Sequence, residues 1–116
     1  MDRPDRQPLH VRRRSGGELV LGICAEYDAL PGLSQAAGKA KKEAIVEGGP
    51  GHGCGHNLLG TAAVAAAIAA NKARIEKKLP GTIQLFGTPA EEQLYGKGFM
   101  VRDGAFKDTD VALSWH

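Results

Sequence analysis

The chain has 116 residues, which is enough for one domain with a hydrophobic core but not for two. Hydrophobic residues make up 42% of the chain and charged residues 24%, as is usual for a soluble protein. The formal net charge of +2 is too small to favour nucleic acid or an anionic membrane as a partner, so both are excluded from the expected functions.

No segment has the pattern of a targeting or membrane-spanning sequence. Residues 1–20 are polar and basic and lack the apolar region of a signal peptide. The longest apolar stretch, residues 58–70, is shorter than the roughly 20 residues that span a bilayer. The two cysteines are too few for a disulfide scaffold, and Cys24, within an apolar run, is expected to be a buried thiol. We therefore expect a cytoplasmic protein.

The first part of the chain predicts a leader, a strand, a loop and a long helix. Residues 1–17 contain a run of arginines and are expected to form an irregular basic leader. Residues 18–25 are apolar and partly β-branched, which is typical of a buried strand. Residues 34–50 are polar and rich in lysine and glycine, and predict an exposed loop. Ala-rich periodicity over residues 57–78 predicts a helix, with Asn57 as its cap.

The rest of the chain predicts two more strands with a short helix between them. Residues 82–87 and 111–115 have strand patterns, and residues 93–103 indicate a helix that two glycines weaken. Strands and helices therefore alternate along the chain. This order predicts an α/β fold over residues 18–116, with a layered parallel or mixed sheet and flanking helices.

Polar residues with metal-binding or acid–base chemistry stand at or just after the ends of the predicted strands: Asp28, Glu91, Glu92 and His116. In open α/β sheets, ligands bind at the carboxyl ends of the strands. The glycine-rich turn that contains Cys54 and His56 precedes the predicted helix and can reach the same edge. We therefore expect residues far apart in sequence to converge there.

Cys54 and His56 are two residues apart, with glycine on each side of the cysteine. Small neighbours let a metal ion approach closely, and a nearby helix N-terminus favours the thiolate. The alternative is a glycine turn that contains these two side chains without any function. This pair therefore indicates a metal site only in combination with other ligands.

Glu91 and Glu92 directly follow an apolar strand, and Pro89 shapes the turn. Adjacent carboxylates can divide the work, because one can bind a metal ion while the other takes a proton from a water molecule. The alternative is that both complement the dipole of the following helix. For His116, the alternative to a metal ligand is an exposed histidine without a functional role. A structural zinc site is not expected, since it would need more cysteines.

Four motifs occur in order along the chain, at residues 26–33, 53–57, 87–92 and 113–116. Together they resemble the amidohydrolase branch of the aminoacylase/carboxypeptidase metallopeptidases, with the closest likeness to the aminobenzoyl-glutamate hydrolase type. The resemblance covers the chain from about Gly22 onward. It implies that the chain is the N-terminal part of a metallopeptidase catalytic domain.

The resemblance implies a centre of two divalent metal ions, zinc or manganese. It assigns metal-ligand roles to four residues: Cys54, His56, Glu92 and His116. It makes Glu91 the general base that activates metal-bound water, and Asp28 an acidic residue that orients a ligand from beneath the site. The implied reaction is cleavage of the amide bond in an N-acyl amino acid or short peptide.

The chain also departs from the pattern of this family. Members are much longer, with a lid-like domain that pairs subunits and a further metal-binding histidine, and neither is found here. The resemblance implies a homo-oligomer for the complete enzyme. Two other hypotheses stay open: a truncated, non-catalytic metal-binding or assembly module, and an α/β fragment without metal.

Overall fold

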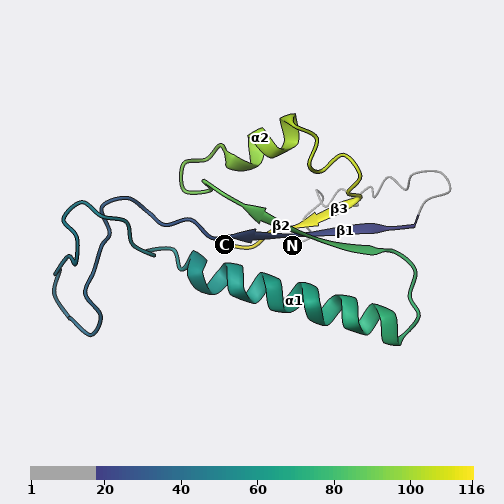
Figure 1. Ribbon diagram of the computed structural model, residues 1–116, viewed down its shortest axis with the longest axis horizontal. Coiled ribbons are helices and arrows are strands. Elements are labelled where there is room, and N and C mark those ends of the chain that lie inside the picture. The colour runs from purple at the N-terminus through teal and green to yellow at the C-terminus, as the bar shows by residue number, and fades with distance from the viewer. Residues whose placement is uncertain (1–17) are drawn as a thin grey trace, which may run out of the picture.

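The structure is a computed structural model, and it describes residues 18–116 (Figure 1). The predicted basic leader, residues 1–17, lies outside the described residues. The elements are β1 (Val20–Glu26), α1 (His56–Glu76), β2 (Thr82–Thr88), α2 (Gly96–Arg102) and β3 (Val111–Leu113). The predicted alternation of strands and helices is confirmed.

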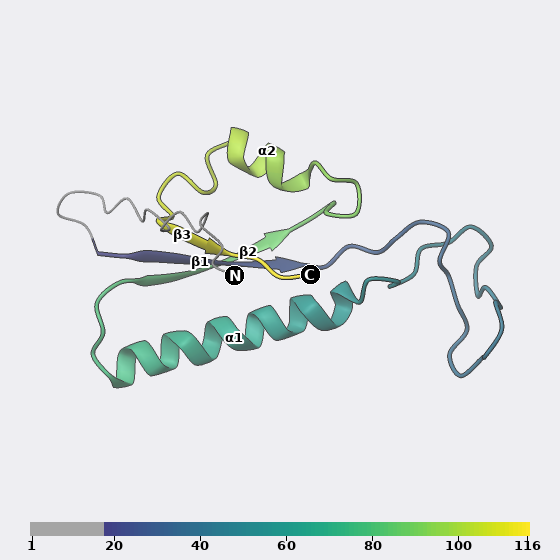
Figure 2. The ribbon, with the colours of Figure 1, turned by 180° about the vertical axis from the view of Figure 1, so that it is seen from behind.

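The three strands form one parallel sheet in the order β2-β1-β3. β1 is central and pairs with β2 along its whole length, from Val20 opposite Thr82 to Glu26 opposite Thr88. Figures 1 and 2 show α1 along one face of the sheet and α2 on the opposite side. The predicted α/β layered fold is therefore confirmed, and all the strands direct their carboxyl ends toward one edge.

A small core joins α1 to the sheet. Ile23 and Ala25 of β1 are buried against Ala63 and Ala67 of the helix. Gly60 permits this close approach, because a Cβ atom there would lie only 2.6 Å from the carbonyl oxygen of Glu26. The absence of a side chain at Gly60 therefore lets the first turns of α1 lie beside the end of β1.

The element boundaries differ from the predictions in two informative places. α1 begins at His56, and its N-cap is Gly55 at φ 84°, without a side-chain cap hydrogen bond. The prediction that Asn57 caps this helix is wrong, because the left-handed turn at Gly55 lets the helix begin before Asn57. β3 ends at Leu113, since only Val111–Leu113 pair with β1. Residues 34–50 form turns and bends, as the predicted loop requires.

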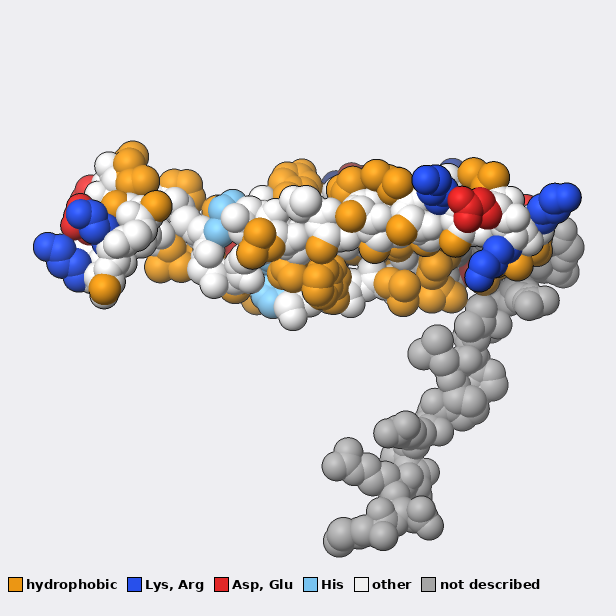
Figure 3. All heavy atoms as spheres, turned by 90° about the horizontal axis from the view of Figure 1, so that it is seen from below, with side chains coloured by type: hydrophobic (Ala, Val, Ile, Leu, Met, Phe, Trp, Pro, Cys, Tyr) orange, Lys and Arg blue, Asp and Glu red, His pale blue; other side chains and the backbone are white. Residues whose placement is uncertain are grey.

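Helix α1 is long and apolar enough to cross a membrane when judged by length and composition, and it is the one such helix among the described residues. The core helix of a soluble protein meets the same criterion. Several apolar side chains of α1 are exposed: Leu58, Val64, Ile68 and Ile75. Figure 3 shows hydrophobic side chains along this face of the molecule. The sequence expectation considered only residues 58–70, whereas the helix continues to Glu76.

Candidate metal centre

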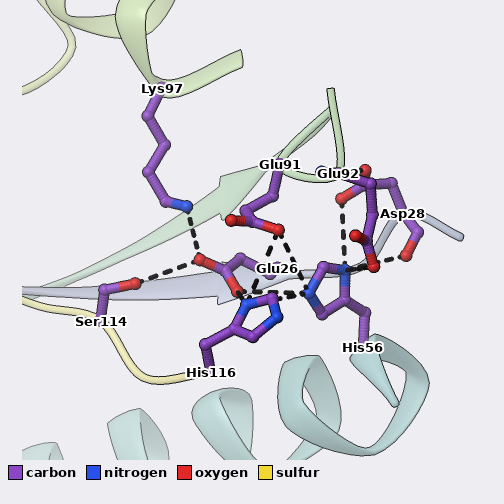
Figure 4. A network of polar contacts seen from close by, with 8 residues as sticks. All are labelled: Glu26, Asp28, His56, Glu91, Glu92, Lys97, Ser114 and His116. Carbon is purple, nitrogen blue, oxygen red and sulfur yellow. Dashed lines mark hydrogen bonds and ion pairs between the residues drawn. The ribbon is translucent and has the colours of Figure 1, made fainter. Parts of the chain in front are cut away.

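Four side chains converge at the carboxyl edge of the sheet: Glu26, His56, Glu91 and His116 (Figure 4). Each offers one potential ligand atom, and these atoms all lie within 4.8 Å of one another. They come from the end of β1, the start of α1, the turn after β2 and the segment after β3. The convergence follows from the parallel sheet, because its strands all end at this edge. We call these four residues the donor group.

His56 is fully buried at the centre of the site. Its Nδ1 lies 2.9 Å from the backbone carbonyl oxygen of Asp28. A carbonyl oxygen can only accept a hydrogen bond, so Nδ1 carries the proton in this contact. Nε2 then has a free lone pair and faces carboxylate oxygens of Glu26 at 3.4 Å and Glu91 at 3.6 Å. This tautomer leaves Nε2 free to bind a metal ion, while the carbonyl oxygen of Asp28 fixes the ring through Nδ1.

His116 closes the donor group from the other side and is about half exposed. Its Nδ1 lies 3.1 Å from Oε2 of Glu26 and 3.4 Å from Nε2 of His56. An open hollow of about 410 Å³ adjoins these atoms, and Glu91, Lys97 and Trp115 also line it. The donor group is therefore accessible from solvent on this side.

A second cluster lies on the Nδ1 side of His56 and contains Asp28, Cys54 and Glu92. Oε1 of Glu92 lies 3.7 Å from Nδ1 of His56, and the Glu92 backbone N–H donates to Oδ2 of Asp28 at 3.1 Å. Hydrogen bonding to the Glu92 carboxylate raises the pKa of the exposed Cys54 thiol. The structure thus places Cys54 beside Glu92, while Glu91 joins the donor group.

The pKa values of the buried Glu26 and of the half-buried Asp28 are both lowered in this environment. Burial alone raises the pKa of Glu26, but hydrogen bonds from Lys97 and His116 outweigh that effect and lower it. For Asp28, burial again raises the pKa, and backbone hydrogen bonds, first from Glu92, more than reverse the change. The edge of the sheet therefore carries buried negative charge.

The residues fit a divalent metal ion. Oδ1 of Asp28 is buried and accepts no hydrogen bond from any of residues 18–116, although it lies 3.5 Å from Nδ1 of His56. A buried carboxylate oxygen without a partner is costly unless a cation compensates it. Imidazole, carboxylate and thiolate are ligands that zinc accepts, and the oxygen and nitrogen donors also suit manganese.

Glu26 and Lys97 are two residues of the site that were not predicted from the sequence. Glu26 stands two residues before Asp28, so the alternation of a strand directs both side chains to one side. That spacing was the available signal for Glu26. Lys97 had no comparable signal, because its contact with Glu26 joins residues that are distant in the chain.

The sequence of the chain matches a family of known proteins. The model of peptidase family M20/M25/M40 matches residues 22–116. The chain belongs to this family. The resemblance that the four motifs indicated is therefore confirmed. No solved structure matches the chain at a significant level.

Three relatives show the range of this similarity. The chain is 54% identical over 100 residues to a subunit of the p-aminobenzoyl-glutamate hydrolase of Escherichia coli (strain K12), covering 86% of the chain and 21% of that protein. It is 36% identical over 101 residues to the Xaa-Arg dipeptidase of Homo sapiens, covering 84% of the chain and 19% of that protein. It is 32% identical over 111 residues to the hippurate hydrolase of Campylobacter jejuni, covering 91% of the chain and 26% of that protein. The chain therefore spans about a fifth to a quarter of the length of these relatives.

Proposed function

We propose that this M20-family chain forms part of a metal-dependent hydrolase that cleaves the amide bond of an N-acyl amino acid of the aminobenzoyl-glutamate kind. The observation that carries the proposal is the convergence of the donor group at the carboxyl edge of the sheet. The 54% identity to the Escherichia coli p-aminobenzoyl-glutamate hydrolase subunit supports this substrate class.

Two divalent ions, zinc or manganese, are part of the proposal. The residues proposed to hold them are Cys54, His56, Glu92 and His116. Once bound, divalent ions polarise a carbonyl oxygen and lower the pKa of water. The buried oxygen of Asp28 without a hydrogen bond supports a nearby cation, and the free lone pair on Nε2 of His56, which faces Glu91, supports a ligand role for His56.

Glu91 is the proposed general base. Its side chain is 20% exposed and lines the open hollow, so a water molecule and a substrate can both reach it. In this role a carboxylate oxygen of Glu91 accepts a proton from the attacking water and passes it to the nitrogen of the departing amine. Asp28 holds the backbone of Glu92 through its Oδ2, and this contact fixes the turn that presents both glutamates.

Cytoplasmic localisation and a homo-oligomeric state belong to the proposal as predictions from the sequence and its resemblance. The exposed apolar side chains of α1, among them Leu58 and Ile68, support association with further protein. The Escherichia coli relative is named as a subunit, so a second type of chain is another partner to test.

A second candidate function is a non-catalytic metal-binding or assembly module. The observation that favours it is the set of exposed apolar side chains on α1, among them Leu58 and Ile68, which a partner chain could cover. Such a module would bind zinc or manganese through the same residues without turning over a substrate.

Hydrolysis of p-aminobenzoyl-glutamate by the zinc- or manganese-loaded chain tests the two candidates together. Glu91→Gln should abolish turnover and leave metal content unchanged, whereas Glu47→Gln, an exposed residue of the loop, should change neither. Bound metal without hydrolysis would favour the non-catalytic module. Normal turnover by Glu91→Gln would refute the proposed base.

A further inference from the structure

An ion pair between Glu26 and Lys97 borders the donor group. The ammonium Nζ of Lys97 donates to Oε1 of Glu26, and Oγ of Ser114 donates to the same oxygen at 3.2 Å (Figure 4). Glu26 is 4% exposed and Lys97 34%. Both donors therefore hold one oxygen of a buried carboxylate, and the other oxygen is left to face inward.

The inward oxygen of Glu26 contacts both histidines of the donor group. Oε2 lies 3.1 Å from Nδ1 of His116 and 3.4 Å from Nε2 of His56. Since a carboxylate is planar and rigid, fixing Oε1 also fixes the direction of Oε2. An ionised carboxylate can only accept, so Nδ1 of His116 donates to Oε2 and its Nε2 carries the free lone pair.

The fold holds Lys97 where it can make this contact. Lys97 is the second residue of α2, directly after the buried Gly96. A Cβ atom at Gly96 would lie 1.7 Å from the carbonyl oxygen of Pro89, so only glycine lets the helix begin against the turn that carries Glu91. The start of α2 and the turn after β2 are therefore in contact, and the ammonium of Lys97 is presented to the end of β1.

We propose that Glu26 and Lys97 act as one positioning unit, in which Lys97 holds the carboxylate of Glu26 so that Glu26 orients the imidazole of His116 for metal binding. This inference rests on the proposed function, because it concerns the orientation of a proposed ligand. Without Lys97, a buried carboxylate loses its cationic partner and turns toward solvent. Oε2 of Glu26 then no longer holds His116.

The first test uses the metal-free chain and nitrogen-15 NMR of the two imidazoles, at a pH where both rings are neutral. The wild-type chain should show His116 with its proton on Nδ1. Lys97→Met and Glu26→Gln should each shift His116 toward a mixture of tautomers, and Lys97→Arg should retain the wild-type signals. Lys77→Met, which removes the same charge at the opposite end of α1, is the matched control.

The double variant decides whether Lys97 acts through Glu26. Adding Lys97→Met to Glu26→Gln should cause no further change in the His116 signals. Wild-type signals in Lys97→Met would overturn the proposal, and so would additive effects in the double variant. Lys97→Gln, which removes the charge but keeps a polar side chain, replaces Lys97→Met if far-UV circular dichroism shows that the latter does not fold.

Binding of Co²⁺ separates this inference from the proposed function. Lys97→Met should weaken Co²⁺ binding about tenfold and alter its visible absorption spectrum, as expected for residues that orient metal ligands. A wild-type chain that binds no Co²⁺, Zn²⁺ or Mn²⁺ would contradict the proposed function, while the metal-free NMR result would still decide the role of the ion pair. Unchanged Co²⁺ affinity in Lys97→Met would overturn the positioning role.

Discussion

The Nδ1 atom of His56 lies 2.9 Å from the backbone carbonyl oxygen of Asp28, and this contact organises the candidate site. It places the proton on Nδ1 and leaves Nε2 of a fully buried ring facing Glu26 and Glu91. His56, the first residue of α1, is thereby fixed to the segment that follows the central strand β1.

Replacement of His56 should weaken the fold as well as the site. In His56→Ala the carbonyl oxygen of Asp28 loses its partner and a buried ring leaves a cavity, so we expect a loss of about 2–4 kcal/mol in the free energy of unfolding. Urea denaturation measures this change. His52→Ala is the control, because His52 is exposed, and it should unfold like the wild type. Equal stability of the two variants would contradict the central packing of His56.

The contact between α1 and the end of β1 depends on Gly60. A Cβ atom there would lie 2.6 Å from the carbonyl oxygen of Glu26, so Gly60→Ala should cost about 1–3 kcal/mol and displace Glu26. Gly98 in α2 has open space at the same position, and Gly98→Ala should be neutral or slightly stabilising. Denaturation midpoints compare the two variants, and a smaller cost at Gly60 than at Gly98 would be inconsistent with this packing.

The two thiols should differ in their reaction with iodoacetamide. Cys54 is exposed and Cys24 is buried, so Cys54 should be alkylated first in the native chain. The pKa of Cys54 is raised, first through hydrogen bonding to Glu92, so its thiolate should form at higher pH than that of a free cysteine. Glu92→Gln removes the negative charge and should move the pH profile of alkylation downward. An unchanged profile would show that Glu92 does not influence the thiol.

Zinc should protect Cys54 from the same reagent if Cys54 is a ligand. The expected result is slower alkylation of Cys54 in the presence of Zn²⁺, with full reactivity restored by a chelator. Labelling of Cys24 in denaturant serves as the reference for complete reaction. Equal rates with and without Zn²⁺, in a chain shown to bind the ion, would remove Cys54 from the ligand set.

Thermal unfolding can distinguish the predicted ligand role of Glu92 from the predicted base role of Glu91. An ion that binds only the folded chain raises the unfolding temperature. Glu91→Gln should keep most of the Mn²⁺- or Zn²⁺-dependent rise, and Glu92→Gln should lose it. The opposite result would assign the ligand role to Glu91, which the structure places with His56 and His116.

Much of the fold followed from local patterns in the sequence. The apolar runs around Ile23 and Leu85 indicated strands, and the Ala-rich segment indicated the helix between them. Parallel strands joined by a helix end at a common edge, and for that reason the convergence of His56, Glu91 and His116 could be expected from the order of the elements alone.

The remaining features depend on contacts that local patterns do not contain. The pairing of Glu26 with Lys97 joins the end of β1 to the start of α2, and no spacing in the chain indicates it. The cap of α1 lies at Gly55 because the turn enters the left-handed region there, whereas residue type alone favoured Asn57. The separation of Glu91 from Glu92 likewise depends on the turn after β2.

Inductively coupled plasma mass spectrometry of the purified chain, beside His56→Ala and His52→Ala, measures whether the donor group binds metal. We expect zinc or manganese in the wild type and in His52→Ala, and loss of the metal in His56→Ala while far-UV circular dichroism shows that this variant remains folded. A folded wild-type chain that takes up neither ion, even when both are supplied in excess, would contradict the claim that this edge of the sheet is a metal centre.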